Sequence, residues 1–237
     1  MEKDLKIEIL FPEFCNLFAD SQNMRYLKQC IPEATFIETS FNEEPKFVSE
    51  KINLIYLGAM TEKMQEKVIA KLKKYKSKIE ELIEQNTIFL FTGNSLEVMG
   101  EYIENEDGSK IEGLGIFKVY AKRDMLHRHN SFFIGDFEGI EIVGFKSQFT
   151  MMYGENENSY FSKVEKGIGI NKDSKYEGIR KNNFLGTYLL GPILILNPEF
   201  TKKLLNKMGI EKPTLAFEKE VEEAYKQRLK EFKEIKE

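Results

Sequence analysis

The sequence predicts an α/β protein with a mixed, largely parallel central sheet flanked by helices. Three apolar runs predict buried parallel strands because each is short and nearly continuous, and two of them end at a glycine: LKIEILF (5–11), INLIYLG (52–58) and TIFLFTG (87–93). Amphipathic helical patterns separate these runs. Such alternation of strands and helices is typical of a parallel sheet.

Two helices are expected between the predicted strands. Residues 23–31 place Met24, Leu27 and Cys30 on one face, which makes Cys30 a core residue. Residues 61–85 repeat apolar side chains among lysines and glutamates, which is the pattern of an amphipathic helix. Thr61 is its expected N-cap.

The second half of the chain predicts antiparallel or mixed pairing. Asp107-Gly108 is a strong hairpin signal. Short strands are then expected at IFKVYA (116–121), SFFIGDF (131–137), IEIVGF (140–145) and LGTYLL (185–190). Asn197-Pro198 should begin a helix that ends at Met208, with Gly209 as its stop signal.

Composition excludes several classes of function. The formal net charge is −4, no basic stripe stands out, and no apolar run approaches the roughly 20 residues that span a bilayer, so neither a nucleic-acid partner nor a membrane span is expected. The start of the chain shows no signal peptide, and two cysteines make no disulfide framework. We therefore expect a cytoplasmic protein.

The chain is interpreted as one domain over residues 1–237, in which 215–237 form a charged C-terminal helix that docks loosely or packs on a partner. No cofactor is expected, because GIGIN (167–171) lacks the spacing of a phosphate loop. No metal is expected either. His127 and His129 are interpreted as a solvated loop with minor potential for anion or partner contact.

The candidate site lies at the carboxyl ends of the predicted parallel strands, where open α/β sheets bind ligands. The turn after the third strand, FTGNSLEVMG (91–100), is where a nucleophile elbow would lie. An elbow exposes one Ser or Cys at a helix N-terminus, where the free N–H groups lower a thiol pKa and stabilise an oxyanion. This chain has the turn without the thiol.

Four segments match one enzyme family in order and spacing. FPEFCNLFADSQNMRYLK (11–28) is similar to Y-P-D-x-x-N-L-Y-x-D-x-G-N, and NLIYLGAMTEKMQ (53–65) stands where that family has a strand and G-G-G-x-D-x-E-Q. FTGNSLEVMG, with its hairpin and GLGI, matches C-G-G-Y-Q-x-L-G. Residues 167–198 match G-x-G-N-N, E-G, N-x-x-G-T-Y-L-H-G-P and N-P. The chain thus resembles class I glutamine amidotransferases of the cobyric acid synthase type, and within them the amidotransferase subunits of lipid II isoglutaminyl synthases. This resemblance implies a flavodoxin-like, three-layer fold.

The departures from the family pattern fall at its chemistry. Gly93 stands where the family has its nucleophilic cysteine, and Leu190 stands where it has the catalytic histidine. The glycine-rich oxyanion loop becomes Gly58-Ala59-Met60, and G-F-E-N-H-G-G-R-T becomes GFKSQFTMM (144–152).

Two further positions match residues that the family uses. Asp20 stands where relatives carry an acid that supports the histidine; it is either a remnant of that triad or an acceptor of N–H bonds at the start of the first helix. Arg128 matches an arginine near the glutamine site, across a variable loop.

The resemblance implies a protein that lacks glutaminase activity, because thioester chemistry needs a thiolate and a proton shuttle. Relatives pass ammonia to a Mur-ligase-like partner, so a non-catalytic subunit or scaffold of such a ligase is the first interpretation. The alternative is an active glutaminase subunit that supplies ammonia for amidation of a cell-wall precursor (lipid II) or a cobyric acid-type substrate, with Cys15 or a partner residue as nucleophile. Ser95 and Thr92 flank the elbow without an evident histidine.

A third interpretation is that the emptied pocket binds another small molecule. Four apolar side chains would then make this pocket less polar than one for glutamine: Met60, Leu96, Met151 and Leu190.

Overall fold

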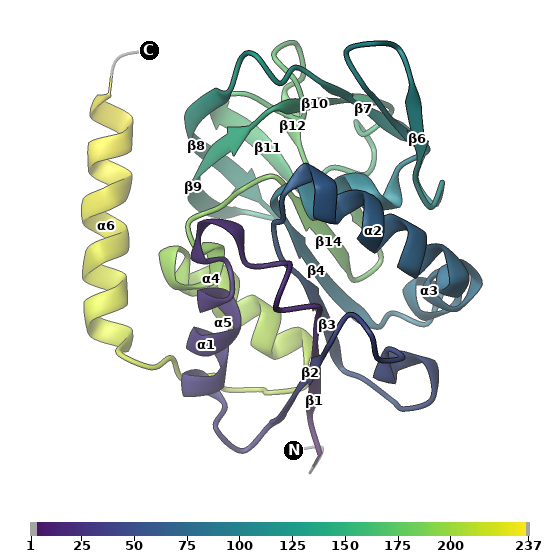
Figure 1. Ribbon diagram of the computed structural model, residues 1–237. Coiled ribbons are helices and arrows are strands. Elements are labelled where there is room, and N and C mark those ends of the chain that lie inside the picture. The colour runs from purple at the N-terminus through teal and green to yellow at the C-terminus, as the bar shows by residue number, and fades with distance from the viewer. Residues whose placement is uncertain (1–3, 236–237) are drawn as a thin grey trace.

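The computed structural model describes residues 4–235 and contains a central six-stranded sheet (Figure 1). Its strands are β1 (Lys6–Leu10), β2 (Thr35–Thr39), β3 (Leu54–Leu57), β4 (Ile88–Thr92), β13 (Ile179–Lys181) and β14 (Phe184–Thr187). They lie in the order β13-β14-β4-β3-β1-β2. Every neighbouring pair is parallel except β13 and β14. The predicted class, a mixed and largely parallel α/β sheet, is confirmed.

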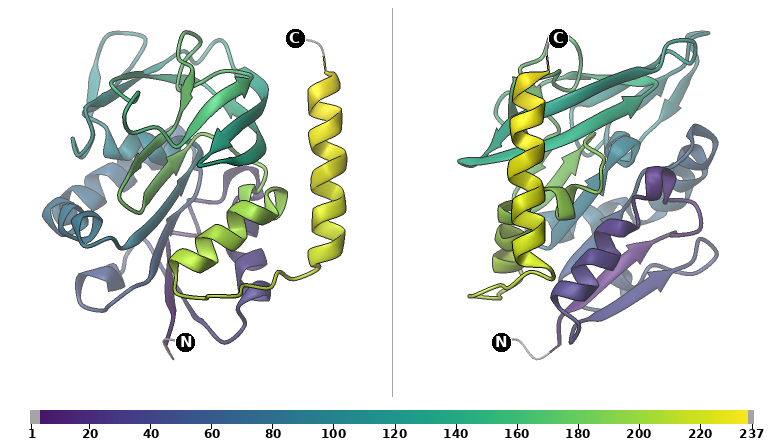
Figure 2. Two further views of the ribbon diagram at one scale, coloured as in Figure 1. Left: turned by 180° about the vertical axis from the view of Figure 1, so that it is seen from behind. Right: turned by 90° about the vertical axis from the view of Figure 1, so that its left-hand side faces the viewer.

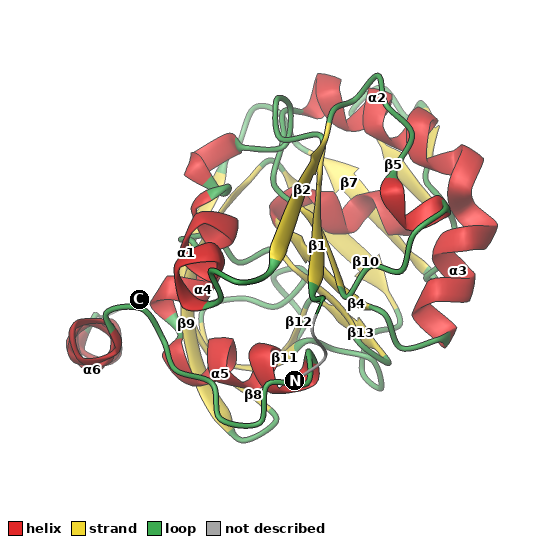
Figure 3. Cartoon of the chain, turned by 90° about the horizontal axis from the view of Figure 1, so that it is seen from below, coloured by secondary structure: helices red, strands yellow, loops and turns green. Residues whose placement is uncertain are grey.

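Helices cover both faces of this sheet. They are α1 (Gln22–Cys30), α2 (Glu62–Leu72), α3 (Lys76–Glu84), α4 (Ile193–Leu196), α5 (Pro198–Lys207) and α6 (Glu218–Glu234). One apolar core lies beneath α2 and α3 and includes Val68 and Ile79. A second core lies beneath α1, α4 and α5 and includes Leu27 and Leu204. Figure 3 shows the sheet between these two helical layers.

The middle of the chain builds two smaller four-stranded sheets. The first has the order β10-β7-β5-β6 and contains β5 (Tyr102–Glu104), β6 (Lys110–Glu112), β7 (Val119–Arg123) and β10 (Thr150–Gly154). The second has the order β12-β11-β8-β9 and contains β8 (His129–Phe137), β9 (Ile140–Gln148), β11 (Ser162–Lys166) and β12 (Tyr176–Glu177). Pairing is antiparallel except between β5 and β7, as the mixed pattern predicted. Gly108 adopts a φ of +80° in the β5–β6 turn.

Several elements differ from the sequence-based prediction. The helix expected over 61–85 is divided by a 3-10 turn at Lys73–Tyr75, which sets the Tyr75 ring against Phe47 at 6.1 Å between centroids. Thr61 occupies the N-cap position, but its side chain makes no capping hydrogen bond. Strand β2 was not predicted. Its residues TFIET carry too few apolar side chains to resemble a buried strand, because β2 lies at the edge of the sheet.

Three further 3-10 helices complete the elements of residues 4–235: Leu17–Ala19, Lys46–Val48 and Gly93–Met99. The strand predicted over 185–190 ends earlier, at Thr187, and Leu190 forms an isolated bridge with Phe145. His129 begins β8, so its assignment to a solvated loop was wrong, whereas His127 is exposed on the preceding loop. The extended pairing of β8 with β9, which starts at His129 and Gln148, explains this difference.

The C-terminal helix α6 runs along the outside of β8 (Figures 1 and 2). Phe232 packs against Phe132 with ring centroids 4.7 Å apart, and the Tyr225 hydroxyl donates to the carbonyl of Glu141 at 2.7 Å. Lys202 of α5 forms ion pairs with Glu218 and Glu222. None of the helices within 4–235 is long and apolar enough to cross a membrane.

Candidate functional site

A cavity of about 150 Å³ lies at the carboxyl edge of the central sheet. Because β1, β3, β4 and β14 are parallel, the segments that follow them converge there. Five residues selected from the sequence line this cavity together: Ala59, Met60, Gly93, Arg128 and Leu190. These residues come from four segments that are up to 131 positions apart in the sequence, and they meet at one place.

The turn after β4 has the backbone conformation of an elbow but no room for a side chain. Gly93 has a φ of +61° and opens a 3-10 helix rather than the expected α-helix. A Cβ placed on Gly93 would lie 2.6 Å from the Cβ of Ala59 and 3.2 Å from Cδ2 of Leu190. The first distance is shorter than real Cβ contacts, so Ala59 occupies the space that a nucleophile here would need.

Leu190 is 2% exposed and is held by backbone pairing with β9. Its N–H donates to the carbonyl of Phe145 at 2.9 Å, and the N–H of Phe145 donates back at 3.4 Å. The isobutyl group therefore lies beside the turn at Gly93 and lines the cavity. It has neither a proton to give nor a lone pair to accept one.

Asp20 is buried at the centre of a polar cluster behind this lining. Its Oδ2 accepts the N–H of Ala59 at 2.8 Å and the hydroxyl of Thr92 at 2.5 Å, while Oδ1 accepts the side-chain amide of Asn23 at 2.9 Å. The Tyr56 hydroxyl donates to the Asp20 carbonyl at 2.9 Å. Asp20 thus joins the loop after β1 to β4 and to residue 59. One interpretation expected the Asp20 side chain to accept backbone N–H groups at the start of α1, and it accepts none there.

The electrostatics of Asp20 follow from its burial. Loss of solvation raises the pKa of its carboxyl, and the hydrogen bonds from Thr92 and Ala59 act in the opposite direction. Gly58 is packed so closely that a Cβ there would lie 2.4 Å from the carbonyl oxygen of Cys15. Asp20 and the carbonyl group of Cys15 therefore support the loop at 58–60 from behind.

The N–H groups of residues 59 and 60, in the loop where an oxyanion loop was expected, already have hydrogen-bond partners. Ala59 donates to Asp20, and Met60 donates to Oδ1 of Asn94 at 3.0 Å. Asn94 also donates through Nδ2 to the carbonyl of Met60 at 2.8 Å. Oxyanion stabilisation needs N–H groups that point at the reacting oxygen. These two N–H groups instead hold the loop against Asp20, which precedes α1, and Asn94, in the 3-10 helix after β4.

The other candidate nucleophiles are not available at this cavity. The Cys15 thiol is buried against Sδ of Met60 at 3.9 Å, and burial raises its pKa. The buried Ser95 hydroxyl donates to the carbonyls of Leu57 and Thr92 at 3.0 and 2.7 Å. The Thr92 hydroxyl donates to Asp20. Cys30 is half-buried on α1, away from the sheet edge.

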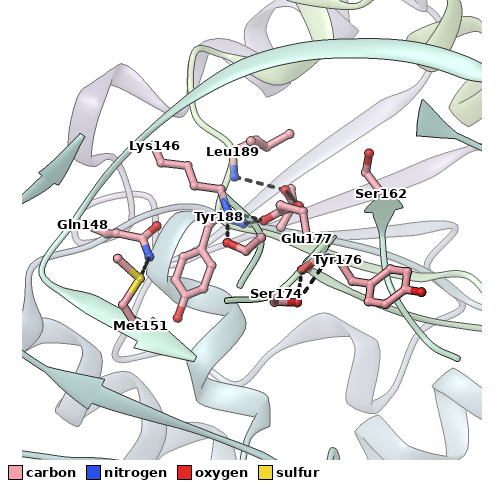
Figure 4. A network of polar contacts seen from close by, with 12 residues as sticks. Lys146, Gln148, Met151, Ser162, Ser174, Tyr176, Glu177, Tyr188 and Leu189 are labelled. Carbon is pink, nitrogen blue, oxygen red and sulfur yellow. Dashed lines mark hydrogen bonds and ion pairs between the residues drawn. The ribbon is translucent and has the colours of Figure 1, made fainter. Parts of the chain in front are cut away.

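Buried charges support the wall that carries Tyr188 and Leu190. Lys146 and Glu177, both fully buried, form an ion pair at 3.4 Å, and Lys146 also donates to the carbonyl of Gly169 at 2.6 Å (Figure 4). Glu177 accepts the Thr187 hydroxyl at 2.7 Å and the N–H of Tyr188 at 2.9 Å. Burial lowers the pKa of Lys146, and Glu177 opposes that change.

A second buried carboxylate lies under the elbow. Glu97, on the 3-10 helix after Gly93, accepts the Tyr188 hydroxyl at 2.8 Å and the Gln65 amide at 2.7 Å, and it also accepts the Thr150 hydroxyl. Burial raises its pKa, against these hydrogen bonds. The elbow is therefore anchored to α2, β10 and the segment before Leu190.

Sequence reasoning missed several residues of the lining. Leu17, Phe18, Asn94, Phe149 and Tyr188 all border the cavity. Asn94 follows the elbow directly, so its position in the turn was the available signal. Leu96 and Met151, expected in the pocket, lie elsewhere: Leu96 belongs to the core, and Met151 lines a neighbouring cavity.

Comparisons with known proteins agree on the family. The CobB/CobQ-like glutamine amidotransferase domain model matches residues 6–197. The chain is 28% identical over 217 residues to the GatD subunit of the glutamine-hydrolysing lipid II isoglutaminyl synthase of Staphylococcus aureus (strain N315), covering 91% of this chain and 88% of that subunit. The corresponding GatD subunit of Streptococcus pneumoniae (strain R6) is 24% identical over 211 residues, covering 85% and 79%.

Solved structures show the same fold at low sequence identity. A crystal structure of a glutamine amidotransferase has a TM-score of 0.57 and 11% identity, covering 86% of this chain and 99% of its own. The PurLQS structure from Thermotoga maritima also has a TM-score of 0.57, with 12% identity and coverage of 86% and 97%. With the family model spanning most of the sequence, the chain belongs to the CobB/CobQ-like glutamine amidotransferase family.

Proposed function

We propose that this protein is a non-catalytic amidotransferase-like subunit that binds and supports a Mur-ligase-like amidating enzyme. The observation that carries the proposal is the contact between residues 59 and 93, where the Cβ of Ala59 occupies the space for a nucleophile's side chain. The fold around this position is intact while the space for the reacting group is filled.

Glutamine hydrolysis by this family requires three things at one place: a nucleophile, a proton shuttle and free oxyanion donors. Gly93 has no nucleophile, and Leu190 has no exchangeable side-chain proton. The N–H groups of Ala59 and Met60 are bonded to Asp20 and Asn94. Loss of nucleophile or base alone commonly costs several orders of magnitude in rate, so the combined losses support a protein without glutaminase activity.

The alternative, an active glutaminase subunit for amidation of lipid II or a cobyric acid-type substrate, has less support. Cys15 would have to leave its contact with Met60, turn toward the cavity and ionise against a raised pKa. No histidine borders the cavity at Gly93 within the described residues; His127 and His129 line a separate one. A nucleophile supplied by a partner chain would still meet bonded N–H groups at 59 and 60.

A protein partner is supported by relatives and by the surface. The similar proteins are subunits of lipid II isoglutaminyl synthases, and the match covers most of each of them. Large apolar side chains are exposed at the cavity rim (Leu17 and Phe18) and on the loop before Arg128 (Met125 and Leu126). Exposed apolar side chains beside a pocket are typical of interaction sites. We infer that the complex works in the cytoplasm, where ATP-dependent ligases have their substrates.

Arg128 is the basic residue in the lining of the cavity at Gly93. Its guanidinium lies 4.5 Å from the Phe149 ring centroid, a stacking distance that holds the side chain at the rim. We propose that it can hold the carboxylate of glutamine or of a similar molecule without turnover. Isothermal titration with glutamine, repeated on Arg128→Ala, measures this binding directly.

The first test is affinity purification of the tagged protein from its native cells, followed by mass spectrometry. Recovery of a Mur-ligase-like protein, and its loss with Phe18→Ser and Leu126→Ser combined, is the expected result. Glu44→Ser, at an exposed position outside α6 and both cavity linings, is the control. The purified complex should then be assayed for ammonia release from glutamine. Release at an enzyme-like rate would overturn the non-catalytic assignment, and absence of any ligase-like protein would overturn the partner.

A further inference from the structure

A second cavity, of about 370 Å³, lies beside the cavity at Gly93, and the function proposed above does not use its residues His129 and Lys172. It is bordered by the start of β8, the end of β7 and the loop after Asn171. Four residues are shared by the linings of both cavities: Arg128, Gln148, Phe149 and Thr150. The two spaces are therefore neighbours separated by the β9–β10 turn.

Positive charge is in excess around this second cavity. Among its basic side chains, Lys122 pairs with Glu104, Arg123 pairs with Glu66, and His127 pairs with the lining acid Asp124. In the described part of the chain, Arg128, His129 and Lys172 form no ion pair. Asp173 is the remaining lining acid. The lining thus keeps two permanent cations and one imidazole against a single unpaired carboxylate.

This excess of positive charge affects the pKa of the His129 imidazole. Burial lowers its pKa, and the ammonium groups of Lys146 and Lys172 lower it further. A bound anion would reverse the second effect. The neutral ring can place its proton on Nε2 and donate it to a ligand.

Unpaired polar atoms gather at the same place. Within residues 4–235, four buried side-chain nitrogen or oxygen atoms have no hydrogen-bond partner, and three belong to residues lining this cavity: Arg123 Nε, His129 Nε2 and Gln148 Oε1. The side chain of Arg123 is only 6% exposed, and Gln148 is 8% exposed. Buried polar groups in native proteins are nearly always paired. A ligand with oxygen acceptors would supply partners for the two N–H groups, with small side-chain adjustments.

We propose that this cavity binds a small anion, a phosphate or carboxylate group, through Lys172 and the imidazole of His129. Lys172 supplies the charge, His129 supplies a directed hydrogen bond, and Arg123 holds the rear wall. This site is distinct from the position of Gly93 and does not depend on whether glutamine is hydrolysed. It gives the protein a ligand of its own.

The chain's only two histidines, His127 and His129, both line the cavity, so their imidazole C–H signals in NMR spectra report on it directly. Inorganic phosphate and glutarate are titrated separately at pH 7, with sodium chloride added to keep the ionic strength constant. A saturable shift, larger at His129 than at His127, is expected with one of them. The probe that gives the saturable shift identifies the bound group as a phosphate or a carboxylate.

Lys172→Ala should weaken this binding about tenfold, the order expected for loss of one hydrogen bond to a charged group. Lys172 is exposed, so this variant should fold normally, and Lys219→Ala on α6 is the matched control. The proposal is wrong if neither probe gives a saturable shift beyond that of chloride. It is equally wrong if Lys172→Ala binds as tightly as the unchanged protein. Recovery of a ligase-like partner would be unaffected by either result.

Discussion

The Cβ of Ala59 lies 2.6 Å from the position that a Cβ on Gly93 would take, so Ala59 leaves no room for a side chain at residue 93. Gly93→Cys is therefore expected to lower the free energy of unfolding by about 2–4 kcal/mol, from overpacking and from a left-handed φ for a residue with a side chain. Urea denaturation measures this change.

The matched variant is Ala59→Gly combined with Gly93→Cys. Removing the Ala59 methyl makes room for the new Cβ, so about half of the lost stability should return, although the unfavourable φ at residue 93 remains. If Gly93→Cys is as stable as the unchanged protein, the space at residue 93 is not filled in solution. The non-catalytic proposal would then lose its main support.

Leu190 is expected to stabilise the protein as a core residue. Leu190→Ala removes a buried isobutyl group beside an existing cavity and should cost about 2–4 kcal/mol of unfolding free energy. Leu126→Ala is the control, because Leu126 is 82% exposed and its truncation should change stability by less than about 0.5 kcal/mol. Equal effects of the two substitutions in thermal or urea denaturation would contradict this role.

Asp20 makes a prediction about pH. Because burial raises the pKa of Asp20 in the folded state, the folded chain binds more protons there than the unfolded chain, whose carboxyl titrates near its ordinary value of about 4. The contribution of Asp20 to stability is thus greatest below that pH and falls as pH rises through the higher folded pKa.

Asp20→Asn removes this titration. The variant should be less stable than the unchanged protein by the largest margin at acid pH, and the margin should narrow toward neutral pH. Denaturation at a series of pH values measures it, and the other buried carboxylates cancel because both proteins contain them. A margin that widens as pH rises would show that Asp20 is instead stabilised as a carboxylate.

The buried pair of Lys146 and Glu177 should be sensitive to the loss of one partner. Lys146→Met leaves the Glu177 carboxylate buried with two hydrogen-bond donors and no cation, which is expected to cost about 3–5 kcal/mol. Adding Glu177→Gln removes the isolated charge, so the double variant should be more stable than Lys146→Met alone. Additive losses in urea denaturation would exclude a coupled pair.

The sequence was most informative where pattern and local chemistry agree. The apolar runs of β1, β3 and β4 predicted the parallel sheet, and Asp107-Gly108 predicted the β5–β6 hairpin of a smaller sheet. The edge strand β2 was missed because its residues TFIET carry no sustained apolar pattern. The break at Lys73–Tyr75 was missed because it depends on the contact between Tyr75 and Phe47, which are distant in sequence.

The candidate site, like the fold, could be predicted only in part. Motif order brought Ala59, Gly93 and Leu190 together from separate segments, but the identity of the groups that bond the loop could not be deduced from it. Asn94 pairs with both the N–H and the carbonyl of Met60, an arrangement set by the path of the backbone rather than by spacing. The role of Asp20 as an acceptor for Ala59 depends likewise on the tertiary fold.

The glycine at the elbow also has a pharmacological consequence. Electrophilic reagents alkylate accessible thiolates, and here the elbow has only a glycine. Cys15 is buried behind the lining, and Cys30 lies at the C-terminal end of α1, packed against the second core. A thiol-directed covalent inhibitor therefore has no target at this edge of the sheet. Compounds directed at the cavity rim or at the neighbouring cavity would have to bind reversibly.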